Sequence, residues 1–364
     1  MSHQVTNLPA DLLEGFAIEV FDRCGLPREH AEAVGKSLVL ANLRGVDTHG
    51  VARIPGYVGR FGPELVNPRP RFEETSRFPW AVAIDADNAM GPVVAEHAMK
   101  GALARAASFG IGGATVRRSN HFGAASLFAL QAPPEGCIGI VMSPASKSLA
   151  PYGSREPLFG TNPFAVAVPA GRHAPWVLDM ATSVAARGHI RLAARRNEPI
   201  PEGWALDAEG RPTTNAQDAL GGVMLPFAGP KGSALAMMVD IMGGVLAGSA
   251  FAGAIRDMNT DFEAPQDVGH FFLAINLAAF MEPHEFAGRM EEAIARLKSL
   301  EPAAGFDEVL YPGELEARRT QTRLKEGIPL TPEVVKALVG VGEELGVPFP
   351  YIEAAAQHEP AARE

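Results

Sequence analysis

A hydroxyl, an imidazole and a guanidinium lie within seven residues, in the stretch Asp47-Thr48-His49-Gly50-Val51-Ala52-Arg53. If a helix begins near Gly50, which admits backbone conformations closed to other residues, Thr48 and His49 lie at its start and Arg53 about one turn in. A proton donor beside a guanidinium that binds carboxylates suits the chemistry of a small keto or hydroxy acid. Taken alone, the stretch favours a plainer interpretation: a helix N-terminus with a capping side chain and a surface arginine.

A second polar stretch, Asn120-His121-Phe122-Gly123, lies in a loop between an expected strand and an expected helix. Proteins of the α/β class usually bind ligands at such loops, and the backbone amides of a helix N-terminus suit a cofactor phosphate. His121 can exchange a proton near neutral pH. On sequence alone, an ordinary loop histidine and a functional one are equally good interpretations.

Three further stretches carry polar groups at turns. Gly160-Thr161-Asn162-Pro163 precedes a strand and is typical of an ordinary Asn-Pro turn. Asp179-Met180-Ala181-Thr182-Ser183 ends a strand and is expected to cap a helix that begins near Val184. Pro230-Lys231-Gly232 places an ammonium at a helix start, where the helix dipole disfavours cations, so this position favours an anion nearby.

The composition excludes several classes of protein. The 364 residues are 47% hydrophobic and 20% charged, which is typical of a globular protein of two or three domain-sized units. The net charge of -10 without a Lys/Arg block argues against nucleic acid and anionic membranes as partners, but not against a small anionic substrate. The chain has no Walker A, H-E-x-x-H or G-x-S-x-G motif and no Cys/His cluster, so metal and serine-nucleophile chemistry have little support.

The expected location is the cytoplasm. Cys24 and Cys137 have no CxxC spacing, which favours free thiols in a reducing compartment. The N-terminus lacks the basic and apolar segments of a signal peptide. The most apolar stretch, 234–251, is broken by Asp240 and by glycines, so we interpret it as a buried helix and not as a membrane span.

The elements that must position these groups follow from apolar spacing. Helical spacing over 8–23, and again from Pro27 to near Gly45, predicts a helical hairpin directly before the Thr48 stretch. The proline-rich residues 62–75 are a candidate connector between domains. Further helices are expected over 91–109, 124–132 and 283–299, from the turn at 311–314 to about 326, and over 332–345. Strands are expected over 80–85, 112–116, 137–143, 163–169, 176–180 and 270–277.

Short successive strands without helices between them predict a mixed sheet, not a purely parallel one. The expected fold class is α/β with α+β character. We expect a helical domain from residues 1–75 plus about 285–364, and a mixed-sheet cofactor-binding domain from residues 76–284. No G-x-G-x-x-G follows a strand, so the sheet domain lacks the Rossmann fingerprint.

These motifs, in this order, resemble the type 2 malate/L-lactate dehydrogenase family, which includes sulfolactate and ureidoglycolate dehydrogenases and cyclic-imine reductases. The resemblance spans about residues 10 to 345. It is carried by Arg44-Gly45, Thr48-His49-Gly50 with Arg53, Asn120 to Gly123, Gly160 to Pro163, Asp179 to Ser183, Gly229-Pro230-Lys231-Gly232 and Tyr311-Pro312-Gly313-Glu314. The family uses NAD or NADP without a Rossmann fingerprint, and its members are typically homodimers.

The resemblance implies roles position by position. His49 and His121 fall where members carry acid/base histidines, Arg53 falls where the substrate carboxylate is held, and Thr161 lies by the substrate. The positions that fall where the dinucleotide is bound are His121, Phe122, Gly123, Ala124, Ala125, Asp179, Met180, Ala181, Lys231, Gly313, Glu314 and Leu315.

Two departures from the family pattern affect the expected chemistry. Many members have Ser where this chain has Thr48, and the hydroxyl that can orient His49 is kept. After Arg187-Gly188, many members have Lys and the cyclic-imine reductases have Asp, whereas this chain has His189 on the substrate side. This departure weakens the imine-reductase alternative.

The resulting hypothesis is reversible hydride transfer between a nicotinamide and a small 2-hydroxy/2-oxo acid. His49 is the favoured acid/base, oriented by Thr48, and His121 is the other candidate. The alternatives are reduction of a cyclic imino acid of the pyrroline or piperideine-2-carboxylate type, a histidine-based lyase or racemase, and a non-catalytic ligand-binding protein. Glu314 favours NAD slightly over NADP, because a carboxylate near the ribose would repel a 2′-phosphate.

Overall fold

The computed structural model describes residues 6–350, which form two compact units. One unit joins the N-terminal segment through Arg69 to the chain from Glu314 onward, and the other is Pro70–Gly313. The sequence placed the corresponding limits at residue 75 and at about residue 285. The expected mixed α/β architecture is confirmed. Among the described residues, no helix is long and apolar enough to cross a membrane.

The first unit is mainly helical. Helices α1 and α2 form the expected hairpin, with buried Leu13, Phe21 and Leu38 between them. A short antiparallel sheet pairs Thr6 with Leu330 and so joins the two ends of the described chain. The elements of this unit are β1 (Thr6–Leu8), α1 (Ala10–Arg23), α2 (Arg28–Leu43), η1 (Asp47–His49), η2 (Val51–Arg53), α3 (Ile54–Val58), α10 (Glu314–Glu326), β12 (Ile328–Leu330) and α11 (Pro332–Leu345).

The second unit is built on a seven-stranded sheet in the order β2-β3-β4-β11-β5-β6-β7. Only the β3–β4 pair is parallel, which confirms the mixed sheet. The strands are β2 (Glu73–Thr75), β3 (Ala81–Asp85), β4 (Ile111–Ser119), β5 (Cys137–Met142), β6 (Phe164–Val168), β7 (Trp176–Met180) and β11 (Val268–Asn276). Strand β4 is longer than expected: Arg117, Arg118 and Ser119 belong to it, not to the loop that follows.

One face of the sheet carries the core of this unit. Helix α4 (Gly91–Phe109) packs on β4 and β11, and α5 (Ser126–Ala129) packs on β5 and β6. Alanines on α4 allow a close approach: a Cβ at Gly112 of β4 would lie 1.9 Å from the carbonyl oxygen of Ala102. The helix therefore lies directly on the strand, and the segments at the ends of β4 and α4 are fixed relative to each other.

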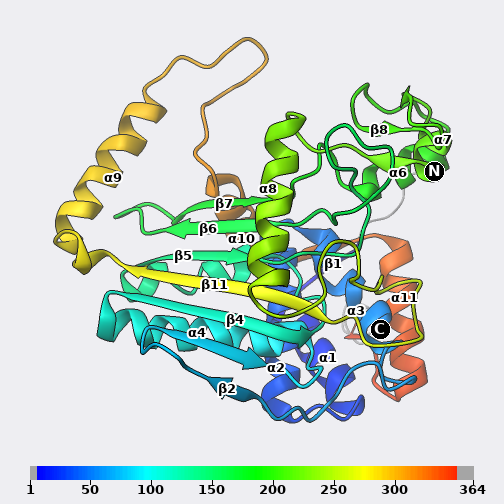
Figure 1. The fold of residues 1–364 in the computed structure, drawn as a ribbon, viewed down its shortest axis with the longest axis horizontal. Helices are drawn as coiled ribbons and strands as arrows, with labels where there is room; N and C mark the ends of the chain where they lie inside the picture. Colours follow the sequence, from blue (N-terminus) through cyan, green and yellow to red (C-terminus); the bar gives the residue numbers. More distant parts are fainter. Residues whose placement is uncertain (1–5, 351–364) are drawn as a thin grey trace, which may run out of the picture. The chain divides into compact units, whose positions relative to one another are not determined.

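Helix α8 (Pro230–Asp240), continued by the π-helical turn η4 (Ile241–Val245), lies across the strands in Figure 1. Its interpretation as a buried helix was wrong. Met237, Ile241 and Val245 are 54%, 43% and 51% exposed, and they recur every four residues, so an apolar stripe faces outward. Only the opposite side of α8, with Ala236 and Val239, is buried.

The remaining elements form two additions to the sheet. A small three-stranded sheet, β10-β8-β9, packs with two helices around Ile190, Ala205 and Met224. Helix α9 lies at the far left of Figure 1 and buries Ile294 against Tyr311. These additions comprise η3 (Pro133–Glu135), α6 (Arg187–Arg196), β8 (Ala205–Leu206), β9 (Pro212–Thr213), α7 (Ala216–Gly221), β10 (Val223–Met224), η5 (Leu277–Ala279) and α9 (Pro283–Lys298).

Candidate active site

The Thr48–Arg53 stretch is not the start of an α-helix, contrary to the sequence expectation. It forms two successive 3₁₀ turns, η1 and η2, and α-helical geometry begins only at Ile54. Gly50 separates the turns because its backbone is extended, with φ -88° and ψ -153°. Thr48, His49 and Arg53 nevertheless remain within two tight turns of one another.

Gly50 is required for space, not for an unusual backbone angle. A Cβ at this position would lie 2.1 Å from Oδ1 of Asn42. That oxygen accepts a hydrogen bond from the backbone N–H of Val51 at 2.8 Å, and Nδ2 of Asn42 donates to Oδ1 of Asp47 at 2.7 Å. The buried Asn42 side chain thus fixes both turns, which the sequence did not reveal.

Thr48 and His49 form the expected pair. Oγ1 of Thr48 lies 3.0 Å from Nδ1 of His49, so the hydroxyl can hold the orientation of the ring. Desolvation, and secondarily the positive charge of Arg53, lowers the pKa of His49 to about 4. The ring is therefore neutral at pH 7 and can accept a proton.

Arg53 is anchored to the same turn. Its Nε donates to the carbonyl oxygen of Thr48 at 2.6 Å. Within residues 6–350 its two terminal Nη groups have no ion-pair partner, so they can bind a carboxylate through two parallel hydrogen bonds. An imidazole that can exchange a proton and a guanidinium that can bind a carboxylate therefore share one backbone anchor, the Thr48–His49 segment.

His121 lies in the second unit, in a loop that is clamped from two sides. Nδ2 of Asn120 donates to the carbonyl oxygen of Ala89 at 2.9 Å and to Oδ1 of Asn88 at 3.0 Å. The backbone N–H of His121 donates to Oε1 of buried Gln266 at 3.1 Å. A Cβ at Gly91, the first residue of α4, would lie 2.3 Å from the Asn120 carbonyl oxygen, so the loop lies directly against that helix start.

The four residues after His121 are buried. Phe122, Ala124 and Ala125 are 2%, 6% and 1% exposed, and the rings of Phe122 and Phe128 stack at 5.2 Å. These side chains belong to the core, so this segment can offer a cofactor mainly its backbone. The expected small-residue helix here is short, since α5 begins only at Ser126.

Asp179 does not cap the helix that follows it, which corrects the sequence expectation. Helix α6 begins at Arg187, and no side chain caps its N-terminus. Oδ2 of Asp179 instead accepts a hydrogen bond from the backbone N–H of Ser126 at 3.3 Å, which ties the end of β7 to the start of α5. Asp179 is exposed, while Met180 and Ala181 are partly exposed.

Thr161 is linked to the Lys231 turn through the backbone. Its carbonyl oxygen accepts from both the N–H (2.8 Å) and the hydroxyl (2.9 Å) of buried Thr182. Phe227 donates to the Thr182 carbonyl oxygen, and Gly232 donates to that of Phe227. Lys231 itself is exposed at the N-terminus of α8, where no side chain caps the first amides.

His189 and the Gly313–Leu315 turn complete the set of expected positions. His189 is exposed on α6, with its ring 6.2 Å from that of Trp204. Gly313 ends the second unit, whereas Glu314 and Leu315 begin α10 in the first unit. Glu314 is 9% exposed, and its carboxylate forms an ion pair with Arg318.

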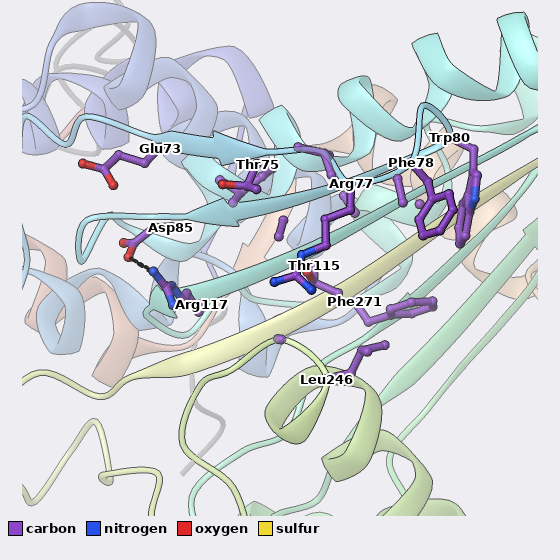
Figure 2. Close-up of a pocket in the computed structure, with 17 residues that line it drawn as sticks. Glu73, Thr75, Arg77, Phe78, Trp80, Asp85, Thr115, Arg117, Leu246 and Phe271 are labelled. Carbon is purple, nitrogen blue, oxygen red and sulfur yellow. Dashed lines mark hydrogen bonds and ion pairs between the residues drawn. The ribbon is translucent and has the colours of Figure 1, made fainter.

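A groove of about 580 Å³ lies elsewhere in the second unit, over β2, β3, β4 and β11. Figure 2 shows Phe78, Trp80, Phe271 and Leu246 along it, with Arg77 nearby, and the Asp85–Arg117 ion pair at its other end. None of the expected site residues lines this groove. The candidate site therefore rests on the polar residues described above and not on this cavity.

Sequence reasoning missed three buried side chains that hold the candidate residues: Asn42, Gln266 and His270. Asn42 and Gln266 leave no mark in the sequence, because a polar residue in a helix or loop is ordinary. His270 had a weak signal, since it is a titratable residue inside an apolar strand.

Comparison with known proteins identifies the family. A model of malate/L-lactate dehydrogenases matches residues 8–339. The chain is 38% identical over 348 residues to a malate dehydrogenase of Pyrococcus abyssi, with 93% of this chain and 95% of the relative covered. It is 36% identical to the NAD(+) ureidoglycolate dehydrogenase of Escherichia coli K12, with 87% and 90% covered.

Solved structures agree with these sequence matches. The sulfolactate dehydrogenase of Methanocaldococcus jannaschii superposes with a TM-score of 0.90 at 34% identity, over 95% of this chain and 99% of that one. A Δ1-piperideine-2-carboxylate reductase of Pseudomonas syringae superposes with a TM-score of 0.82 at 28% identity, over 92% and 99%. Among the sequence relatives, an NADP(+) (2R)-3-sulfolactate dehydrogenase of Chromohalobacter salexigens is 34% identical, with 88% of this chain and 93% of the relative covered.

Fold and matches together define an oxidoreductase of the 2-hydroxy acid dehydrogenase class with a nicotinamide cofactor. The chain belongs to the malate/L-lactate dehydrogenase family. The resemblance stated from the motifs is confirmed. This assignment favours the dehydrogenase over the lyase and the non-catalytic binding protein.

Proposed function

We propose that this protein interconverts a small 2-oxo acid and its 2-hydroxy acid, with Arg53 as the carboxylate ligand and His49 as the acid/base. The observation that carries the proposal is the shared anchor of these groups: Thr48 contacts the His49 ring at 3.0 Å and binds Arg53 through its carbonyl oxygen at 2.6 Å. A carboxylate on Arg53 fixes the adjacent carbon of the substrate, which is the reacting carbon.

The bound nicotinamide supplies or accepts the hydride. In reduction, His49 donates a proton to the forming alkoxide oxygen, and in oxidation it removes the hydroxyl proton. The low pKa of His49 suits the basic role in the enzyme without substrate. A carboxylate bound to Arg53 offsets the positive charge that helps to lower this pKa, so substrate binding favours protonation of His49. His121 is the alternative acid/base.

The second unit offers groups that fit a dinucleotide. The exposed ammonium of Lys231, in the first turn of α8, suits a phosphate. The backbone of His121 to Ala125 is held rigidly beside the start of α4 and can line a flat ring or a ribose. Asp179 is exposed and can accept hydrogen bonds from hydroxyl groups. We assign the cofactor to Lys231, the His121 loop and Asp179.

NAD is the proposed cofactor, with a modest preference over NADP. Glu314 supports this choice, because a carboxylate beside a ribose repels a 2′-phosphate. Its ion pair with Arg318 reduces that repulsion, which is why the preference is modest. Relatives of both kinds exist, one named for NAD(+) and one for NADP(+).

Malate, lactate, sulfolactate and ureidoglycolate are the proposed substrate types, since each presents a carboxylate next to the reacting carbon. The second candidate is reduction of a cyclic imino acid, favoured by the likeness to the piperideine-2-carboxylate reductase. His189, assigned to the substrate side with Thr161, is exposed and lacks the carboxylate that such reductases carry, so this candidate ranks second.

A substrate panel tests the proposal. The purified protein is assayed with NADH and NADPH against pyruvate, oxaloacetate, sulfopyruvate and oxalurate, and against pyrroline- and piperideine-2-carboxylates. We expect turnover of a 2-oxo acid that is lost on Arg53→Met and on His49→Ala, while Arg28→Met, at an exposed ion pair of the same unit, stays active. Turnover of the cyclic imines alone would select the second candidate. No fluorescence change of either reduced cofactor on mixing would reject both.

The proposed assembly is a homodimer in the cytoplasm. The outward stripe of Met237, Ile241 and Val245, and Phe78, which is 64% exposed, are apolar groups that a subunit interface would cover. The two cysteines, Cys24 and buried Cys137, are free thiols, as in a reducing compartment. Light scattering should give a molar mass of two chains for the wild type and of one chain for Ile241→Lys. Fractionation of cells tests the location.

A further inference from the structure

His270, in β11, is a buried histidine that the proposed reaction does not use. It lies on the α4-facing side of the sheet with Phe272, and both side chains are 0% exposed. Desolvation lowers the pKa of His270 to about 3, so the ring is neutral throughout the physiological range. A neutral imidazole has one N–H donor and one acceptor nitrogen.

Two serine hydroxyls hold this ring. Nδ1 of His270 lies 2.9 Å from Oγ of Ser143, and Nε2 lies 3.0 Å from Oγ of Ser119. Oγ of Ser119 in turn donates to the carbonyl oxygen of Asn120 at 3.3 Å. Ser143 can donate to Nδ1 while Nε2–H donates to Ser119. The hydroxyl of Ser143 has a second acceptor, the carbonyl oxygen of Pro144 at 3.2 Å. This chain of hydrogen bonds ends on the backbone of Asn120, the residue before His121.

The face of the same ring holds the residue after His121. The rings of His270 and Phe122 stack at 4.5 Å between centroids with an interplanar angle of 3°. The ring of Phe122 also stacks with that of Phe128, at 5.2 Å between centroids. His270 therefore contacts the loop on both sides of His121, through Ser119 to Asn120 and directly at Phe122.

A β-bulge brings Ser119 to the ring. Ser119 pairs with Val268 and Val116 pairs with His270, so β4 has one residue more than β11 between these pairs. The extra residue is Arg118, whose φ is +52°. In a regular strand, Ser119 would face the opposite side from Val116, because the two residues are three positions apart. The bulge returns Ser119 to the face of Val116 and His270. The bulge thus serves the contact between Ser119 and His270.

We propose that His270 is a positioning residue: with Ser119 and Phe122, it holds His121 in the place from which it contacts the cofactor. The inference rests on the proposed function, which assigns His121 to the cofactor side. His270 is fully buried and does not itself touch the reactants. Its effect is on the backbone position of the loop, where a shift of about 1 Å can cost on the order of 100-fold in rate.

A matched pair of serine variants tests the inference. Ser119→Ala removes the hydroxyl that links the ring to the loop, whereas Ser143→Ala removes the hydroxyl on the other side of the same ring. The dissociation constant of NADH is measured by fluorescence and KM for the 2-oxo acid by kinetics, with circular dichroism to verify folding. We expect Ser119→Ala to raise the dissociation constant about tenfold, with substrate KM changed less than about threefold. Ser143→Ala should stay within about twofold of the wild type.

His270→Phe and His121→Ala complete the design. His270→Phe keeps a stacked ring but loses the hydrogen bonds, and it should weaken cofactor binding at least as much as Ser119→Ala. If His121→Ala weakens NADH binding while folded Ser119→Ala and His270→Phe bind like wild type, the inference is wrong and the proposed site stands. If Ser143→Ala raises the dissociation constant of NADH as much as Ser119→Ala does, the network only stabilises the core, and the inference is also wrong. If His121→Ala binds NADH normally, the assignment of His121 to the cofactor fails, and the inference fails with it.

Discussion

Arg323 binds Asp47 through both ends of its guanidinium: Nη1 lies 2.6 Å from Oδ1 and Nη2 lies 3.0 Å from Oδ2. The two residues are 276 positions apart in the chain, and both belong to the first unit. Nη1 also donates to the carbonyl oxygen of Asn42. Helix α10 thus holds the first residue of the turn that carries His49.

Replacement of Arg323 should impair turnover more than it impairs folding. In Arg323→Gln the Asp47 end of the turn loses its two-point contact, so we expect kcat/KM to fall about tenfold through displacement of His49. The partly exposed ion pair should contribute only about 1 kcal/mol to the free energy of unfolding. Steady-state kinetics and urea unfolding measure the two effects. Arg28→Gln, which removes an exposed ion pair on α2, is the control, and equal kcat/KM in both variants would contradict the expectation.

Gly50→Ala should destabilise the first unit. The new Cβ meets Oδ1 of Asn42 at 2.1 Å, so the Asn42 side chain must move and give up its hydrogen bonds. We expect a loss of about 1–3 kcal/mol in unfolding free energy. Gly15→Ala is the matched control, because nothing lies within 4 Å of its Cβ. That variant should gain about 0.5–1 kcal/mol, since Gly15 lies inside α1.

A second change makes the Gly50 test specific. If the clash with Asn42 is the cause, adding Asn42→Ala to Gly50→Ala should cost much less than Asn42→Ala costs alone, because the two effects share one contact. Chemical unfolding of the four proteins of this cycle gives the coupling energy. Simple additivity of the two losses would show that Gly50 is needed for some other reason.

The sequence predicted the regular elements better than it predicted the local geometry around Gly50. Regular apolar spacing was enough to place α4 over 91–109 and α11 over 332–345, because these helices bury one continuous stripe. It failed at Gly50, where an extended residue between two 3₁₀ turns depends on Asn42, eight residues earlier. Apolar spacing predicts single elements, whereas the geometry of this turn depends on Asn42 in α2.

The same limit explains the errors on exposure and capping. The stretch 234–251 is apolar on both sides of its helix, so its composition gave no sign that the Met237 side faces outward. Asp179 lies near the end of β7, where a capping residue was expected, but its carboxylate accepts a hydrogen bond from Ser126, which is distant in sequence. The roles of His49, Arg53 and Lys231 came from the family resemblance, and the experiments proposed for them supply the test.

The pH dependence of kcat/KM distinguishes the two histidines. His49 must be neutral to accept a proton, and its pKa of about 4 in the free enzyme means that kcat/KM for oxidation should fall only below about pH 4. In the reduction direction His49 must be protonated, so kcat/KM should decrease about tenfold per pH unit above that value. Rates from pH 4 to 9 in both directions give the two profiles. An inflection that persists in His49→Gln and vanishes in His121→Gln would assign the proton transfer to His121.

Lys231→Met should weaken the binding of the cofactor and leave the binding of the substrate unchanged. A hydrogen bond to a charged group contributes about 1.5–3 kcal/mol, which corresponds to roughly a 10- to 100-fold rise in cofactor KM. The substrate KM should change little, because in the proposed site Arg53, and not Lys231, binds the substrate carboxylate. Lys100→Met, at an exposed position of α4, controls for the loss of one positive charge in the same unit. An unchanged cofactor KM would remove Lys231 from the cofactor site.

The buried His270 should make the protein less stable in acid. Its pKa is about 3 in the folded protein against 6.5 for the free side chain, so below pH 6.5 the unfolded chain binds a proton that the folded protein does not. Stability from this group is therefore complete above pH 6.5 and is lost as the pH falls toward 3, with a slope of at most about 1.4 kcal/mol per pH unit. His270→Phe cannot take up this proton, so its unfolding free energy should decrease less between pH 6.5 and 4.5 than that of the wild type.

Urea unfolding at intervals across this range measures both slopes. His49 contributes in the same direction in both proteins and cancels in the comparison. Parallel slopes for the two proteins would mean that His270 accepts a proton in the fold, and the neutral ring described above would be wrong.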